Sequence, residues 1–304
     1  MFHRTSLFAA KPALRGDPSL GKKRDVGEPV VHIGRKQGED MGSNNITVKR
    51  EGKTALVQFD RKDDLNALSV DLMRGLIEVA RSFEDDLETT TVVLTGSAKA
   101  FSAGLDLRDP KILEAMHAPL GKRRNALAIG PSLCRAWEAV EQVTICAIEG
   151  HCVGGGVSLA VSCDFRIMGE GAHFRVPELQ LGMNMSWQTI PRMVHLVGPA
   201  RTKEIIILAE KVGAQQALTW GLAQEVVEDG ETVSHALAMA EKIAAIPPLP
   251  VRMTKEAVNA ATNVLDHTAS YMDRDQFMLC QLTEDHRRAV TAFGKKERPS
   301  FKGE

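Results

Sequence analysis

The sequence predicts an α/β fold with a mostly parallel sheet. Three β-branched or apolar runs, at 91–95, 143–148 and 165–168, each lead into a loop and then a helix-like segment. Parallel strands need such crossovers, because the chain must cross back before it can run in the same direction again. The chain has 304 residues, of which 43% are hydrophobic, so it can fill the core of one large domain or two small ones.

A β-hairpin and a capped helix open the predicted domain. Strands at 46–50 and 54–59 flank the turn Glu51-Gly52-Lys53. Ser69 is suited to cap a helix that runs to Phe83. Apolar residues recur in this segment at helical spacing, namely Val70, Met73, Ile77 and Ala80.

The later part of the chain reads as helical. Helices are predicted at 199–210, 214–219, 231–244 and 251–261, and a charged amphipathic stretch follows at 265–293. Three prolines, Pro247, Pro248 and Pro250, interrupt the chain before the last two of these segments. We therefore expect a core at 45–246 and a C-terminal helical region at 247–304.

The first 44 residues differ from the rest. Residues 1–24 hold six basic side chains and one acidic one, Asp17. Such a start is compatible with a mitochondrial transit peptide, which would place the protein in the mitochondrial matrix. We favour a disordered extension at 1–44 on a cytoplasmic protein.

Composition argues against several classes of function. The net charge of −1 and the aromatic content of 5% offer neither a basic field nor stacking platforms for nucleic acid. The five cysteines form no CxxC pair and the nine histidines form no HExxH motif, so we expect no metal site. The apolar run 143–163 is interrupted by Glu149, His151 and three glycines, which argues against a membrane span.

Two loops of small residues carry the strongest functional signal. Gly154–Gly156 follow the strand at 143–148, and Ser102-Ala103-Gly104 come after the strand at 91–95. Glycine is entropically costly, and it is favoured where the backbone must approach a ligand with its N–H groups exposed. Two such loops can direct two backbone donors at one developing oxyanion.

Three segments together resemble the crotonase superfamily, the enoyl-CoA hydratase/isomerase family. They are Ala-Phe-Ser-Ala-Gly-Leu-Asp at 100–106, Gly-His-Cys-Val-Gly-Gly-Gly at 150–156, and Cys163-Asp164. The resemblance extends from about residue 46 to the C-terminus. It implies a ββα spiral core with a C-terminal helical trimerisation region, and hence a homotrimer or homohexamer.

The resemblance also implies a binding site for an acyl-CoA thioester. The oxyanion donors would be the N–H groups of Leu105 and Gly155, with no cofactor beyond the coenzyme A of the substrate. Asp106 looks like a cap for the segment after the loop, and Asp164 like a strand-edge hydrogen-bonding residue. Arg61 and Lys62 are either phosphate partners or solvated loop charges. The expected coenzyme A contacts are Arg61, Lys62, Ala67, Leu68, Ala103 and Asp106.

Glu178 is the expected general acid/base, with Ser158 beside it. Hydratases of this family usually carry two glutamates, and the first of these positions is Ser158 here. Glu178, in Phe-Arg-Val-Pro-Glu, matches the second, and burial before an apolar run would raise its pKa towards the operating range. A helix-terminus partner is the plainer interpretation of a single such glutamate.

These residues leave several reactions open. We favour hydration of 2-enoyl-CoA to 3-hydroxyacyl-CoA, with Δ3,Δ2-enoyl-CoA isomerase and hydroxycinnamoyl-CoA hydratase-lyase as alternatives. A non-catalytic acyl-CoA-binding subunit is the alternative outside enzymes. Ser186 stands where dienoyl-CoA isomerases carry an aspartate, which argues against that reaction. Met183, Met185 and Trp187 either line an acyl pocket or belong to the core.

Overall fold

The main sheet is built from the strands that the sequence predicts. In the computed structural model, which describes residues 45–62, 64–295 and 297–304, the first sheet has six strands. The predicted extension at 1–44 lies outside these residues. In spatial order the strands are β1 (Ile46–Glu51), β2 (Thr54–Phe59), β3 (Thr91–Thr95), β5 (Val143–Ile148), β7 (Phe165–Gly169) and β10 (Glu225–Val227).

Strand directions agree with the prediction. β1 and β2 pair antiparallel, with Ile46 opposite Phe59, which confirms the hairpin. The pairs β2–β3, β3–β5, β5–β7 and β7–β10 are all parallel, as the crossovers require.

A second sheet of four short strands was not predicted. Its order is β4 (Ala100–Ser102), β6 (His151–Val153), β8 (His173–Arg175) and β9 (Val212–Gly213), and only β9 runs antiparallel to its neighbour. Strands of two or three residues are too short to show the alternation that reveals a strand in a sequence. β4, β6 and β8 each follow a strand of the main sheet, so the chain spirals between the two sheets.

Gly150 makes one of these corners possible. Its φ is +55°, and a Cβ at this position would lie 2.0 Å from the carbonyl oxygen of Lys99. Only glycine avoids both the left-handed strain and this collision. The corner brings β6 alongside β4, and thereby brings the two glycine-rich loops together.

The helices follow the predicted order, with differences in their bounds. α1 (Val70–Arg81) begins after Ser69, whose hydroxyl accepts a hydrogen bond from the Leu72 amide, as predicted. The other helices up to residue 181 are α2 (Pro110–His117), α3 (Leu120–Ala126), α4 (Ile129–Glu138), α5 (Gly155–Ala160) and the short 3-10 helices η1 (Asp64–Asn66) and η2 (Glu178–Leu181). After them come α6 (Thr189–Lys203), the π-helical turn η3 (Glu204–Leu208), α7 (Ala214–Trp220), α8 (Thr232–Ala244), α9 (Pro248–Thr262), η4 (Asn263–Leu265), α10 (Asp266–Ser270), α11 (Asp273–Gln281) and α12 (Glu284–Lys295).

Two of the helical predictions need correction. The helix predicted at 199–210 begins earlier, at Thr189, and kinks at Gly198, where φ is +75°. The stretch 265–293 is not one continuous helix but is divided among η4, α10, α11 and α12. Both errors arise where glycine or a short turn breaks an otherwise periodic pattern.

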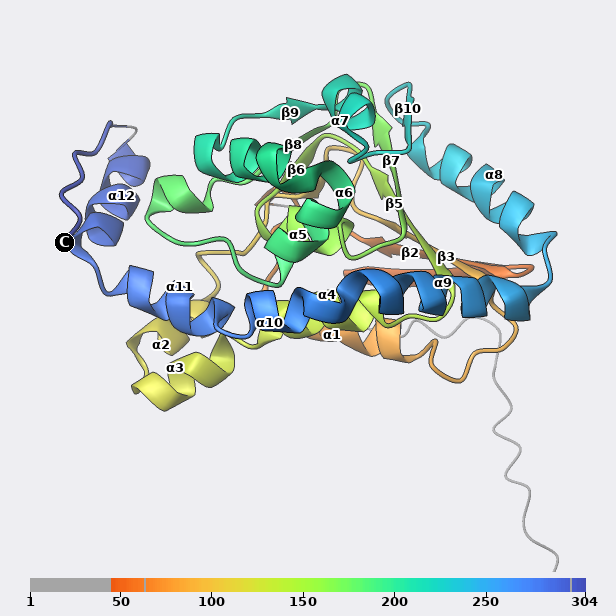
Figure 1. Cartoon of the computed structure of the whole chain (residues 1–304), viewed down its shortest axis with the longest axis horizontal. Helices are drawn as coiled ribbons and strands as arrows, with labels where there is room; N and C mark the ends of the chain where they lie inside the picture. Colours follow the sequence, from red (N-terminus) through yellow and green to blue (C-terminus); the bar gives the residue numbers. More distant parts are fainter. Residues whose placement is uncertain (1–44, 63, 296) are drawn as a thin grey trace, which may run out of the picture. The chain divides into compact units, whose positions relative to one another are not determined.

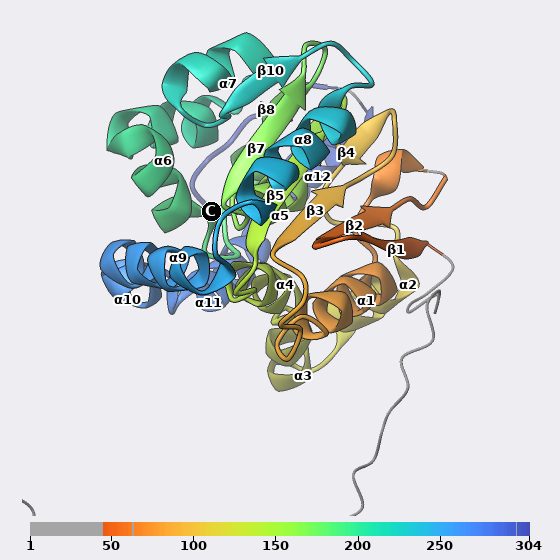
Figure 2. The ribbon, with the colours of Figure 1, turned by 90° about the vertical axis from the view of Figure 1, so that its right-hand side faces the viewer.

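The core lies on both faces of the main sheet. On one face α8 packs across β3, β5 and β7 through Ala236 and Ala240, and Figure 2 shows this helix in front of the strands. The larger cluster on the other face joins the sheet to α1, α4 and α5. In Figure 1 the blue helices α9, α10 and α11 follow one another in a row past α4.

Candidate active site

The loop before α1 supports the first of the two predicted oxyanion loops. The side-chain amide of Asn66, in a left-handed conformation with φ of +61°, donates to the carbonyl oxygens of Phe59 and Phe101 at 2.8 and 3.0 Å. Ser102 Oγ in turn donates to the carbonyl oxygen of Asn66 at 2.8 Å. No such role for Asn66 was expected from the sequence. Its burial between two loops shows it to be their common anchor.

The two expected oxyanion donors lie side by side. The Leu68 amide donates to Gly104 O at 2.7 Å, and the Asp106 amide donates to Leu68 O at 3.1 Å. The amide of Leu105, between Gly104 and Asp106, takes no part in these two bonds. Within the part of the chain that the structure describes, neither Leu105 N nor Gly155 N donates to a protein acceptor. A Cβ placed on Gly155 would lie 3.5 Å from Leu105 N, which measures how close the two loops come.

Glu178 lies directly against the second loop. It opens η2, and its Oε1 would be only 2.5 Å from a Cβ placed on Gly154. Its Oε2 is buried and has no hydrogen-bond partner among the described residues. Burial raises the pKa of Glu178 from 4.5 to about 7. This carboxyl group can therefore both take up and release a proton near neutral pH.

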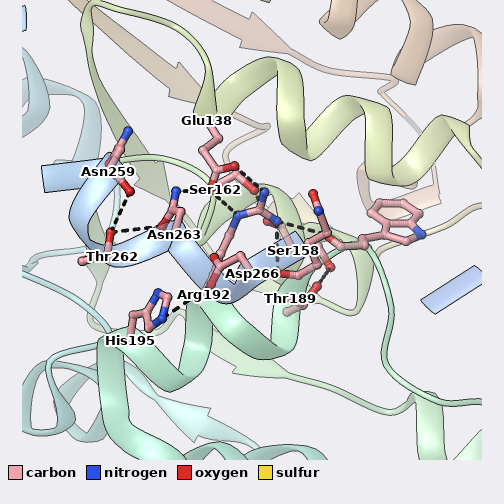
Figure 3. A network of polar contacts seen from close by, with 12 residues as sticks. Glu138, Ser158, Ser162, Thr189, Arg192, His195, Asn259, Thr262, Asn263 and Asp266 are labelled. Atoms are coloured by element: carbon pink, nitrogen blue, oxygen red, sulfur yellow. Dashed lines mark hydrogen bonds and ion pairs between the residues drawn. The ribbon is translucent and has the colours of Figure 1, made fainter. Parts of the chain in front are cut away.

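Ser158 is fully buried in the helix that follows the second loop. Its Oγ lies 2.7 Å from the hydroxyl oxygen of Thr189 and 3.4 Å from the carbonyl oxygen of Gly154. The hydroxyl pair joins α5 to the first residue of α6. Figure 3 shows Ser158 and Thr189 pointing toward one another.

A strained turn carries Trp187 onto the oxyanion glycine. Trp187 and Gln188 have φ values of +62° and +59°, a left-handed conformation that is unfavourable for bulky residues. The indole ring is so close to Gly155 that a Cβ there would lie 2.7 Å from two ring carbons. It also contacts Gly130 of α4, where a Cβ would lie 2.0 Å from Cε2.

Three elements hold this turn in place. Arg192 of α6 donates from Nη1 to the carbonyl oxygens of Trp187 and Gln188, at 3.0 and 3.2 Å. Glu138 of α4 receives the same guanidinium in a fork at 2.8 and 2.9 Å, and Figure 3 shows the pair within a wider polar network. From α11, Asp273 Oδ2 accepts the amide of Gln188 at 3.0 Å. The clamp was not foreseen from the sequence, because its members come from helices far apart in the chain.

A large apolar cavity adjoins the site; we refer to it as the apolar chamber. Its volume is about 810 Å³, and its near end includes Leu105, Met183 and Trp187. Its other walls come from α2, α3, α4, α11 and α12. Of the residues expected at an acyl pocket, Met183 and Trp187 line the chamber, whereas Met185 belongs to the hydrophobic core.

The residues expected to contact coenzyme A lie in and beside the two loops. Arg61 donates from Nη1 to Asp106 Oδ2 at 2.7 Å and to Ala67 O at 3.0 Å. Although burial opposes it, the hydrogen bonds from Arg61 and from the Arg108 amide hold the pKa of Asp106 below its usual value. Lys62 is exposed. Leu68 and Ala103 join the loop before α1 to the first glycine-rich loop, since the Leu68 amide donates to Gly104 O and the Ala103 amide donates to Leu65 O at 3.0 Å.

Asp164 has the structural role that the sequence predicted. Its Oδ2 accepts from the amide of Thr144 at 2.7 Å and pairs with Lys255 Nζ at 2.7 Å. Asp106, which accepts from the Arg108 amide at 3.0 Å, caps the segment after the first loop as expected.

Neither a metal cluster nor a membrane span is found in the described part of the chain. No group of three or more His, Cys, Asp or Glu residues there is placed to hold a metal ion. Nor does any helix in these residues combine the length and apolarity needed to cross a membrane. All five cysteines are free thiols.

Comparison with known proteins agrees with the resemblance. The family model described as Enoyl-CoA hydratase/isomerase matches residues 49–304. A short-chain-enoyl-CoA hydratase of Clostridium acetobutylicum is 34% identical over 85% of this chain and 97% of its own length. A crotonyl-CoA hydratase of Syntrophomonas wolfei is 32% identical over 86% of this chain and 99% of its own.

Solved structures show the same fold. The crystal structure of an enoyl-CoA hydratase from Bacillus anthracis superposes with a TM-score of 0.67 at 31% identity, over 86% of this chain and all of that one. The match to the family model, the relatives above 30% identity and the shared fold lead to one conclusion. The chain belongs to the enoyl-CoA hydratase/isomerase family, as the glycine-rich loops indicated.

Proposed function

We propose that this protein adds water to 2-enoyl-CoA thioesters and forms 3-hydroxyacyl-CoA. The relatives named short-chain-enoyl-CoA hydratase and crotonyl-CoA hydratase support this assignment. The observation that carries it is the carboxyl group of Glu178, which has a buried, unpartnered oxygen among the described residues and a pKa of about 7, and which lies against the glycine next to Gly155.

The backbone amides stabilise the charge that develops during the reaction. The thioester carbonyl oxygen accepts from Leu105 N–H and Gly155 N–H as electron density moves onto it. Each donor of this kind typically contributes about 10²–10³ in rate. The contacts around Asn66 hold the loop that carries Leu105, and the Gly154 amide, next to Gly155, donates to Arg175 O at 2.9 Å. Because both donors are fixed in this way, they need no reorganisation when the charge appears.

Glu178 moves the protons. Its carboxylate takes a proton from water while the water oxygen bonds to the β-carbon, and the π electrons move to form an enolate. The protonated Glu178 then gives the proton to the α-carbon, so that one water is added in total. A group that works in both directions needs a pKa near the operating pH, which burial provides here.

Ser158 takes a supporting role in this proposal. A hydroxyl cannot act as a carboxylate base, but it can orient water or hold the loop. Its contacts with Thr189 and Gly154 O support the second of these roles directly. Because Ser158 stands where the first family glutamate would be, Glu178 is the single carboxylate expected at this site. The second candidate is therefore the Δ3,Δ2-enoyl-CoA isomerase reaction, which needs only one group to carry a proton along the acyl chain.

Substrate binding and assembly complete the proposal. We place coenzyme A along Lys62, Ala67, Leu68 and Ala103, with Arg61 and Asp106 bracing that loop, and no cofactor beyond the coenzyme A of the substrate. We further propose a cytoplasmic homotrimer or homohexamer that assembles through residues 247–304. Large apolar side chains exposed there support this: Leu249, Met253, Val264, Leu265 and Leu279. Sedimentation as a monomer at micromolar concentration would contradict the assembly.

Turnover of three thioesters tests the reaction. The purified protein should hydrate crotonyl-CoA faster than it isomerises 3-hexenoyl-CoA or acts on feruloyl-CoA.

Glu178→Gln should lower kcat roughly 10²–10⁴-fold with little change in acyl-CoA affinity, because it removes only the proton-transfer group. Ser158→Ala should cost less. The exposed Glu170 gives a matched control, Glu170→Gln, which should behave as the wild type. Near-wild-type turnover by Glu178→Gln, together with an inactive Ser158→Ala, would reverse the two roles.

A further inference from the structure

The apolar chamber is larger than the smallest enoyl thioester requires. Its volume of about 810 Å³ lies in the range of pockets that hold entire drug-sized ligands. A crotonyl group extends only one methyl group beyond its double bond. Most of the chamber would stay empty of substrate if crotonyl-CoA were the preferred substrate.

The chamber is continuous with the candidate active site. Leu105, whose amide is one of the two expected oxyanion donors, is also part of the chamber wall. So is Trp187, whose indole ring contacts Gly155, the other donor residue. An acyl chain whose carbonyl oxygen is bound between these two amides therefore begins at the wall of the chamber.

The lining of the chamber suits an aliphatic chain. Most of its surface is formed by aliphatic and aromatic side chains, such as Ile112, Leu113, Leu127, Ile129, Phe277 and Val290. Two of the polar residues in the wall are bonded to other protein groups. Arg123 donates from Nη2 to Gln281 at 2.5 Å, although its buried Nε has no partner among the described residues, and the His286 ring is bonded to the carbonyl oxygen of Leu181 at 2.8 Å. An apolar chain would thus bury CH₂ groups against matching surface.

The near wall is fixed by the clamp around Trp187. Two successive left-handed residues persist only where the surrounding structure holds them, and Arg192 and Asp273 do so here. The indole ring cannot move towards Gly130 or Gly155, because it is already in contact with both. The ring therefore acts as a rigid wall along which the first carbons of the acyl chain must lie.

We propose that the preferred substrates are linear 2-enoyl-CoA thioesters of medium chain length, whose acyl chain passes the Trp187 indole and lies in the apolar chamber. This inference rests on the proposed hydratase function and adds the class of acyl chain. It differs from the short-chain and crotonyl substrates that the names of the two relatives record.

The expected effect follows from the burial of each added methylene. A buried CH₂ group contributes about 0.8 kcal/mol, which is about fourfold in kcat/KM. The value of kcat/KM should therefore rise from crotonyl-CoA through 2-hexenoyl-CoA to 2-octenoyl-CoA. Over the four added methylenes the full effect would be roughly 200-fold.

A substitution in the chamber wall tests where the chain lies. Ala126 of α3 lines the chamber, so Ala126→Phe should fill part of it and lower kcat/KM for 2-octenoyl-CoA at least tenfold. Crotonyl-CoA should be affected less than threefold, since its chain ends near Trp187. Ala238 of α8 is exposed and outside the chamber, so Ala238→Phe is the matched control and should leave both substrates unchanged.

The outcomes separate this inference from the function on which it rests. Hydration of every chain length with crotonyl-CoA as the best substrate would overturn the medium-chain assignment and leave the hydratase function intact. Equal losses on both substrates in Ala126→Phe would show that the chain does not lie in the chamber. Absence of hydration with all three thioesters would overturn the proposed function, and this inference with it. The chain-length series on the wild type needs no variant to fold and by itself decides the medium-chain assignment.

Discussion

Glu178 should make the stability of the protein depend on pH, and this can be measured without any substrate. The perturbation is Glu178→Gln, which keeps the size of the side chain and removes its charge. In the folded protein burial raises the pKa of Glu178 to about 7, whereas in the unfolded chain the group titrates near its ordinary pKa of 4.5. The folded state therefore holds a proton between these two values that the unfolded state has released.

The sign and size follow from this difference. A raised carboxyl pKa gives a contribution to stability that is fully present below pH 4.5 and is lost as the pH rises through 7. The gap of about 2.5 pKa units corresponds to about 3 kcal/mol. The substituted amide does not titrate, so the free energy of unfolding of Glu178→Gln relative to the wild type should rise by about 3 kcal/mol between roughly pH 4 and pH 8.

Urea denaturation of both proteins at one fixed protein concentration, at several pH values, measures this difference. Any cost of burying the substituted amide itself shifts all points equally and leaves the pH dependence unchanged. Glu170→Gln removes the same charge from an exposed position and serves as the control. A difference between Glu178→Gln and the wild type that stays constant across this pH range would refute the burial of this carboxyl group.

Further predictions concern the loops and the indole. Arg61→Ala should destabilise the protein by about 3 kcal/mol in urea denaturation, because the buried carboxylate of Asp106 loses its guanidinium partner and keeps the hydrogen bond from the Arg108 amide. In an Asp106→Asn background the loss should be smaller, and an equal loss would show that the ion pair does not account for it. Gly155→Ala should lower kcat by about 10² or more at unchanged expression, since its methyl group would collide with the Trp187 ring and displace an oxyanion donor. Trp187→Ala should lower kcat/KM by about the same factor as Gly155→Ala, for all chain lengths. Trp220→Ala, which removes the indole ring beneath Arg201, is the control and should leave kcat/KM unchanged. Equal effects of the two substitutions would show that Trp187 has no special role.

The sequence revealed those parts of the molecule whose signals are local. The hairpin, α1 with its Ser69 cap, and the strands β3, β5 and β7 each have a periodicity or a capping residue within a few positions. The glycine-rich loops were visible for the same reason: Gly154–Gly156 alone also fit a tight strand-to-helix turn, and the second loop at 102–104 favoured an oxyanion site. Residue-by-residue resemblance then supplied Glu178, and its burial in the structure agrees with that choice.

Other parts depend on contacts between distant segments and could not be predicted. The second sheet has strands of only two or three residues, and its pairing becomes evident only when Gly150 turns the chain. Nothing near Trp187 in the sequence indicates that Glu138 and Asp273 would meet there. Arg61 illustrates the same difficulty: as a loop cation it suggested either a phosphate partner or a solvated charge, whereas in the structure its guanidinium is bonded to Asp106.

The contacts of α11 and α12 have a consequence for how the protein is made. Asp273 of α11 holds the Gln188 amide, and His286 of α12 packs its backbone against Gly182 and bonds to Leu181 O. A ribosome synthesises these helices after both glycine-rich loops and Glu178. Until they dock, the segment 181–188 lacks two of its fixed points, so a nascent or C-terminally nicked chain can have its sheets formed and still have no ordered site. Activity should therefore appear only after α12 has been synthesised and has packed against Gly182 and Leu181.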